Sequence, residues 1–126
     1  LFGCGWADEH QVDSAIRDCW ERTRYVIDPQ TACGYFVMRR MPRDPAVPRV
    51  LLSTASPFKF PRVVSRALGL DAVGTDFACM DSLAEATGTV PPTALRSLEK
   101  APVRFTDVVA VDGMTEFVRG AAAALV

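Results

Sequence analysis

The sequence predicts an α/β fold that is mostly helical and contains about two strands. Three observations lead to this prediction. Apolar residues recur in several stretches at the three- and four-residue spacing of an amphipathic helix. Residues 49–54 form a short apolar run of the kind found in buried parallel strands. Prolines and glycines separate these stretches and mark the turns.

The composition is that of an ordinary globular domain, and it excludes some partners. The chain has 126 residues, enough for one domain with its own core. Its net charge of −1 creates no strong field for nucleic acid or an anionic membrane. The longest apolar run, residues 121–126, is too short to span a bilayer. We therefore expect a cytoplasmic protein without nucleic-acid or membrane partners.

The reactive residue types are few. The four cysteines, at positions 4, 19, 33 and 79, form no C-x-x-C pair, and His10 is the only histidine. Because a zinc site needs a tighter cluster, we expect reduced thiols and no metal. There are two lysines, Lys59 and Lys100. The chain starts at Leu1 rather than methionine, so we expect a fragment or a processed product.

The first predicted helix follows Asp8, with Gln11 three residues later completing a capping box. Its expected inward stripe is Val12, Ala15, Ile16, Cys19 and Trp20. Two acid–base pairs lie four residues apart in the favourable order, namely Asp13 with Arg17 and Asp18 with Arg22.

A second helix is predicted from Asp28-Pro29 to about Arg40, because aspartate caps helices and proline suits their first position. Gly34 inside this helix permits close packing. Three prolines mark residues 41–48 as a loop. The predicted strand over residues 49–54 follows, and a helix from Pro61 ends at Gly69, so that strand and helix together resemble half of a βαβ unit.

Further helices are predicted over residues 75–87, from Pro91-Pro92 to Lys100, and over residues 113–125 after a cap at Asp112. Residues 105–109 are a candidate second strand. Since two strands alone make a marginal sheet, either a larger sheet includes them or the helices pack into a small α/β layer.

Three hydroxyls, those of Ser53, Thr54 and Ser56, follow the first predicted strand and precede a helix. Ligands of open α/β sheets bind at such strand ends, where hydroxyls and helix N–H groups contact ring nitrogens or anions. Turn formation and helix capping explain the same residues, and from the residues alone this is the favoured of the two interpretations, which both stay open. Likewise, a helix cap explains Asp28 and Pro29 but leaves Gln30 and Thr31 unexplained.

Two segments in this order resemble the paired motifs of bacterial and fungal threonine synthases. Residues 27–34 read I-D-P-Q-T-A-C-G, where that family typically has D-P-H-T-A-V-G. Residues 50–61 read V-L-L-S-T-A-S-P-F-K-F-P, similar to T-A-S-P-Y-K-F. The resemblance extends over essentially the whole chain. Gln30 replaces the usual histidine of the first motif, and Cys33 replaces a valine.

The resemblance implies that the chain is the C-terminal part of the large domain of a pyridoxal-phosphate fold type II protein. Such an enzyme converts O-phosphohomoserine and water to threonine and phosphate, using pyridoxal phosphate as an electron sink. Its Schiff-base lysine and phosphate-binding loop lie upstream of these motifs. We therefore expect no covalent cofactor and no catalytic residue in this chain.

The resemblance also assigns roles residue by residue. Thr54 matches the threonine that hydrogen-bonds the pyridine nitrogen, and Ser53 lies beside it. Candidate substrate-site residues are Gln30, Thr31, Ser56 and Lys59. Lys59 matches a motif lysine that is not the Schiff-base residue, and its stem is also a candidate for packing between two phenylalanines.

Three functions remain as hypotheses at this point. In the first, residues 1–126 are one incomplete domain of threonine synthase, inactive alone, whose partner is the remainder of that chain. In the second, this is a non-catalytic threonine-synthase-like domain for packing or partner binding. In the third, it is an unrelated α/β binding module with an anion site at the hydroxyl turn. We also expect self-association through exposed apolar surface.

Overall fold

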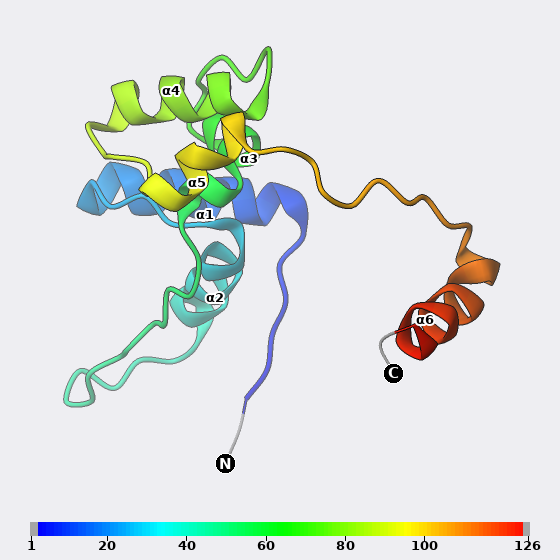
Figure 1. Cartoon of the computed structure of the whole chain (residues 1–126). Helices are drawn as coiled ribbons and strands as arrows, with labels where there is room; N and C mark the ends of the chain where they lie inside the picture. Colours follow the sequence, from blue (N-terminus) through cyan, green and yellow to red (C-terminus); the bar gives the residue numbers. More distant parts are fainter. Residues whose placement is uncertain (1–2, 125–126) are drawn as a thin grey trace.

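As a computed structural model, the structure describes residues 3–124, which form helices joined by extended segments (Figure 1). The α-helices are α1 (Glu9–Thr23), α2 (Pro29–Arg40), α3 (Pro61–Ala67), α4 (Asp76–Thr87), α5 (Thr93–Arg96) and α6 (Met114–Ala123). Short 3-10 turns are η1 (Pro57–Lys59), η2 (Ser97–Lys100) and η3 (Val111–Gly113). None of these helices is both long and apolar enough to cross a membrane.

The predicted α/β class is wrong, because residues 3–124 contain no strand and the fold is mainly helical. Residues 49–54 are extended but form no backbone hydrogen bond with another described segment. Val50 is 81% exposed and Leu52 is 76% exposed. Residues 105–109 are also extended and exposed. A strand needs a neighbour for its N–H and C=O groups, and neither segment has one among the described residues.

Helix α1 begins as predicted. The Asp8 carboxylate accepts a hydrogen bond from the Gln11 N–H at 2.8 Å, and the Gln11 side chain accepts from the Asp8 N–H at 3.0 Å. This capping box satisfies donors that the first helical turn leaves unpaired. The central residues of the predicted stripe, Ala15, Ile16 and Cys19, are buried, so the helix faces the core as expected.

Arginine side chains attach α1 to α3. The predicted Asp18–Arg22 ion pair is present. Arg17 and Asp13, predicted to pair with each other, bond to α3 instead. Arg17 Nε donates to the Ala67 carbonyl at 2.9 Å, and the Asp13 carboxylate accepts from Arg66 at 3.3 Å. These contacts are tertiary, which is why helical spacing alone did not reveal them.

Helix α2 occupies the predicted range and supports the extended segment that follows it. A Cβ on Gly34 would lie 2.9 Å from the Leu51 side chain, so glycine permits this close approach. Arg49 holds the intervening proline-rich loop, since its guanidinium donates to the carbonyls of Met38, Met41 and Pro42. These bonds also satisfy carbonyls that the end of a helix leaves free.

Helices α3 and α4 match their predicted ranges and pack against each other. Gly69 and Gly88 follow them with φ of 74° and 67°, the left-handed conformation that glycine adopts easily. The Thr75 hydroxyl caps α4 by accepting from the Ala78 N–H at 3.1 Å. Buried residues of α1 to α4 and η1 share one core, which includes Ile16, Phe58, Val64, Met80 and Leu83.

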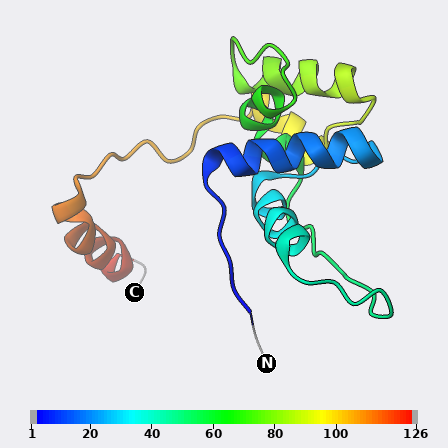
Figure 2. The ribbon, with the colours of Figure 1, turned by 180° about the vertical axis from the view of Figure 1, so that it is seen from behind.

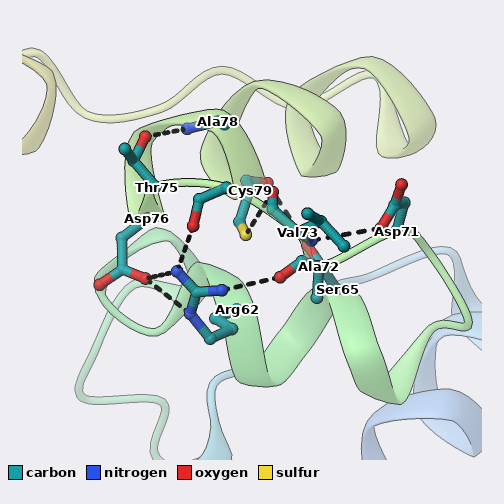
Figure 3. Close-up of polar contacts among 10 residues, drawn as sticks. Arg62, Ser65, Asp71, Ala72, Val73, Thr75, Asp76, Ala78 and Cys79 are labelled. Atoms are coloured by element: carbon teal, nitrogen blue, oxygen red, sulfur yellow. Dashed lines mark hydrogen bonds and ion pairs between the residues drawn. The ribbon is translucent and has the colours of Figure 1, made fainter.

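Arg62 fixes the loop between α3 and α4 (Figure 3). Its guanidinium donates to the Ala72 carbonyl at 2.7 Å, to the Gly74 carbonyl at 2.8 Å and to the Asp76 carboxylate at 3.0 Å. Beneath the loop, the buried Ser65 hydroxyl donates to the Cys79 carbonyl at 3.3 Å. One planar side chain therefore holds both the loop backbone and the first turn of α4.

The C-terminal quarter differs most from expectation. The helix predicted to reach Lys100 breaks into α5 and η2. Helix α6 forms, but Asp112 lies in η3 and does not cap it, and the predicted end at Leu125 lies outside the described residues. No described residue of α6 is buried. Figures 1 and 2 show α6 standing apart from α1 to α5 at the end of an extended segment.

We expect Arg62→Lys to lower the free energy of unfolding by about 1 kcal/mol, because an ammonium cannot reproduce the three-way planar contact. Urea unfolding followed by circular dichroism measures this. The control is Arg43→Lys in the proline-rich loop, which removes no hydrogen bond described here. Equal unfolding midpoints for the two variants would show that the Arg62 contacts contribute nothing to stability.

Candidate functional site

A buried carboxylate organises the start of α2. Asp28 has no exposed surface. Its Oδ2 accepts from the N–H groups of Gln30 at 3.0 Å and Thr31 at 3.2 Å, and its Oδ1 accepts from the Thr31 hydroxyl. The positive end of the helix dipole and these donors stabilise a negative charge that burial would otherwise disfavour.

Thr31 connects this cap to the extended segment 49–54. Its Oγ1 is hydrogen-bonded to the Ser53 Oγ at 3.3 Å, across 22 residues of sequence. Thr31 is 4% exposed, whereas Ser53 is exposed. The structure therefore brings together two of the residues that the sequence singled out, one from each of the two segments.

Thr54 and Gln30 lie beside this pair with their side chains in solvent. Both residues are exposed, and neither side chain makes a hydrogen bond within the described part of the chain. The Gln30 backbone N–H is held by Asp28, so that cap fixes where the side chain begins. A hydroxyl and an amide next to the Thr31–Ser53 bond can donate to, or accept from, a polar ligand.

Ser56 and Lys59 are engaged elsewhere. The half-buried Ser56 hydroxyl accepts from the Phe58 N–H at 3.3 Å and caps η1, which is the turn chemistry that the sequence left as an alternative. Lys59 is exposed, with its Nζ 5.6 Å from the centroid of the Phe60 ring. No hydrogen bond in the described residues joins either side chain to the Thr31–Ser53 pair.

Sequence reasoning treated Asp28 only as a cap and missed that it orients Thr31. The signal was the three-residue spacing from Asp28 to Thr31, which places a hydroxyl at the third position of the helix beside the capping carboxylate. Among residues 3–124 no cluster of His, Cys, Asp or Glu has the arrangement of a metal site, and Cys4, Cys19, Cys33 and Cys79 are free thiols.

A cleft of about 240 Å³ lies between α1 and α2 and was also missed. The Tyr35 hydroxyl donates to Asp18 Oδ2 at 2.8 Å there, and Arg39 approaches the same carboxylate at 3.9 Å. The hydrogen bond from Arg22 is the main cause that lowers the pKa of Asp18. Burial, followed by the bond to Asp18, raises the pKa of Tyr35. The contacts of Tyr35 and Arg39 with Asp18 link the two helices across this cleft.

We expect Asp28→Ala to cost about 2 kcal/mol of unfolding free energy or more, since it removes a cap and leaves the buried Thr31 hydroxyl without its acceptor. The matched control is Asp8→Ala, an exposed cap worth about 1 kcal/mol. Chemical denaturation of both variants gives the comparison. If Asp8→Ala proves the more damaging, the buried cap is not the stronger one.

Asp18 predicts a dependence of stability on acid pH. Because its pKa is lowered in the folded state, its stabilisation is present above the unfolded pKa and is lost as pH falls through the lower folded value. The stability difference between wild type and Asp18→Asn should therefore shrink as pH falls below about 4. Urea unfolding of both proteins from neutral to acid pH tests this, and a constant difference would contradict it.

A protein-family model matches a range of this chain that includes both residues of the Thr31–Ser53 hydrogen bond. The family model described as "Threonine synthase, C-terminal" matches residues 31–118, well over half of the chain. The matched range begins at Thr31 and includes Ser53, Thr54, Ser56 and Lys59, while Gln30 lies one residue before it. The range also includes the extended segment 101–110 and the first turn of α6.

Two curated relatives support the same family. "Threonine synthase" of Pseudomonas aeruginosa is 34% identical over 67 residues, which is 53% of this chain and 14% of that protein. "Threonine synthase-like 1" of Mus musculus is 27% identical over 99 residues, which is 79% of this chain and 13% of that protein. The chain thus spans about a seventh of each relative. No solved structure matches. From the range of the family match, this chain belongs to the threonine synthase C-terminal family.

Proposed function

We propose that residues 1–126 are one incomplete C-terminal domain of a threonine synthase, the enzyme that converts O-phosphohomoserine and water to threonine and phosphate. The observation that carries the proposal is the Thr31–Ser53 hydrogen bond, which joins the two motif segments into one site. The family match supports the same conclusion. Alone, the chain is inactive, because the Schiff-base lysine of the reaction belongs to the preceding part of the enzyme.

In this proposal the chain forms one wall of a pyridoxal-phosphate site. The cofactor supplies an electron sink for carbanions when it is bound. The available donors fit such a ring, since Thr54 presents a neutral hydroxyl in solvent beside Ser53. A hydroxyl near the pyridine nitrogen donates a hydrogen bond without protonating it, which limits the charge that the ring accepts. Asp28 and Thr31 hold Ser53, and through it the segment that carries Thr54.

Four residues are proposed to belong to the substrate site, with the buried Thr31 supporting it from beneath. Gln30 and Thr31 start α2 beside this wall, and Gln30 acts as a neutral hydrogen-bonder where related sequences have histidine. Ser56 caps η1 and Lys59 ends it, and the two supply a hydroxyl and a positive charge for an anionic substrate. Their present contacts, with Phe58 and Phe60, leave Lys59 exposed to solvent.

The partner in this proposal is the remaining polypeptide of the enzyme. The relatives are about seven times longer than the matched part, in keeping with a site completed by other residues. Exposed apolar side chains after Lys100 would contact that polypeptide, and in its absence would promote self-association. A place in amino-acid biosynthesis would locate the protein in the cytoplasm.

One observation favours a second candidate, a non-catalytic domain that serves packing or partner binding. Gln30 replaces the histidine of the first motif, and an amide cannot transfer protons as imidazole does. In that case the contacts among Asp28, Thr31 and Ser53 would serve only to stabilise the fold. The two candidates differ in whether the site takes part in catalysis once the rest of the enzyme is present.

A chimaera distinguishes the candidates. In it, this chain replaces the C-terminal segment of the Pseudomonas aeruginosa threonine synthase that aligns with it. If the chain is catalytic, the chimaera produces phosphate and threonine from O-phosphohomoserine. Thr54→Val then lowers kcat about 10-fold or more and changes the absorbance of the bound cofactor, while Thr54→Ser retains both.

Gln30→His in the same chimaera is the matched comparison. A folded, cofactor-loaded chimaera that is inactive with Gln30 and becomes active with Gln30→His would support the non-catalytic candidate. A loaded chimaera that stays inactive in both forms would contradict the proposal that this segment supplies a threonine synthase site.

A further inference from the structure

The extended segment 49–54 returns alongside α2 and touches that helix at three points (Figures 1 and 2). The contact pairs are Thr31 with Ser53, Gly34 with Leu51, and Met38 with Arg49. The first is a hydrogen bond between hydroxyls at 3.3 Å, and the third is a hydrogen bond from the guanidinium to a carbonyl at 2.5 Å. In the second, a Cβ on the glycine would lie 2.9 Å from the leucine side chain.

These contacts repeat at the spacings of a helix and of an extended chain. On α2 they fall three and four residues apart, about one turn each, so they share one face of the helix. On the segment they fall two residues apart, so they share one side of the extended chain. One helical turn rises about 5.4 Å and two extended residues span about 6.6 Å, so the two repeats nearly match. Segment 49–54 therefore lies antiparallel to α2 in one register.

The residues between these contacts face the other way. Val50 and Leu52 alternate with the contact residues and are 81% and 76% exposed. Thr54 is the next residue in this alternate set, and it is exposed as well. A shift of register by one residue would exchange the two sides of the segment and turn Thr54 toward α2. The contacts on one side thus decide where the Thr54 hydroxyl is presented.

Gly34 makes this register possible through its small size. Its φ is not positive, so an ordinary residue could adopt its backbone conformation. Glycine inside a helix is less stable than alanine, and nothing in the geometry of α2 itself calls for it. The Leu51 side chain does, since it occupies the space beside the place of a Cβ. By contrast, a Cβ on Gly120 in α6 would meet no atom within 4 Å.

Arg49 fixes the segment at its start. Besides the Met38 carbonyl, its guanidinium donates to the carbonyls of Met41 at 2.9 Å and Pro42 at 2.6 Å. A planar group with several donors in fixed directions can hold three carbonyls at once, which an ammonium group cannot reproduce. The first residue of the segment is therefore tied to the end of α2, five residues before Thr54.

We propose that Gly34 and Arg49 are positioning residues for Thr54. Gly34 lets Leu51 lie against α2, and Arg49 holds the start of the segment, so that Thr54 is presented on the side away from the helix. The inference rests on the proposed function, in which the Thr54 hydroxyl serves the pyridine ring of the cofactor. Each of the two residues acts through the register of the segment rather than through contact with the cofactor.

Nuclear magnetic resonance of the full chain tests the register without any cofactor. Gly34→Ala should displace Leu51 and shift the backbone amide signals of Ser53 and Thr54. Adding Leu51→Val, which removes the clashing methyl group, should return both signals toward their wild-type positions. Gly120→Ala, a second glycine inside a helix, is the matched control and should leave both signals unchanged. Signals that ignore Gly34→Ala, or that do not recover in the double variant, would overturn the proposal.

The chimaera with the Pseudomonas aeruginosa enzyme tests the consequence for the cofactor. Gly34→Ala and Arg49→Lys should each lower kcat about 10-fold or more and change the absorbance of the bound cofactor, because small misplacements of a reacting group are costly. Leu51→Val should rescue the first variant and not the second. Arg43→Lys is the control in the proline-rich loop and should change neither quantity. Variants that lower only the yield of folded chimaera, with kcat and absorbance intact, would reduce both residues to a structural role and overturn the proposal.

The two experiments separate this inference from the function on which it rests. An active chimaera that is indifferent to Gly34→Ala and Arg49→Lys would overturn the positioning role and leave the proposed function standing. A cofactor-loaded chimaera that is inactive with the unaltered chain and with Gln30→His would contradict the proposed function. In that case the amide signals of Ser53 and Thr54 decide by themselves whether Gly34 sets the register.

Discussion

The buried carboxylate of Asp28 is the interaction on which the site depends. It closes the start of α2, and it holds the Thr31 hydroxyl that bonds to Ser53. Such a charge is tolerated in the interior because helix N–H groups and a hydroxyl surround it. The segment 49–54 is also held by Leu51 against Gly34 and by the hydrogen bonds of Arg49.

Arginine is the main connector in the rest of the fold. Arg17, Arg49 and Arg62 each donate to backbone carbonyls in another element or loop, and Arg66 pairs across helices with Asp13. The planar guanidinium has several donors in fixed directions, so a single side chain can hold a loop that lacks regular structure. These arginine contacts add to the packing of the small helical core, which includes Ile16, Val64 and Leu83.

The chain has two surfaces of functional interest. The Asp28–Thr31–Ser53 cluster presents Thr54 and Gln30 to solvent, where a polar ligand can be met by a hydroxyl and an amide. The cavity of about 320 Å³ whose lining includes Phe77 and Leu98 is mainly apolar. The second motif segment contributes to both, since Ser53 belongs to the cluster and Phe58, Lys59 and Pro61 line the cavity.

The sequence by itself determined what depends on neighbours within a few residues: the capping box at Asp8, the cap at Asp28, and the glycines that follow α3 and α4. It also identified the family from two short motifs. Only the tertiary structure decided the rest. Residues 49–54 have the composition of a strand but lack a pairing partner in the described chain, and Thr31 meets Ser53 only because α2 and that segment pack together. Caps are set by local backbone geometry, whereas strand pairing and side-chain contacts across 22 residues require distant atoms to meet.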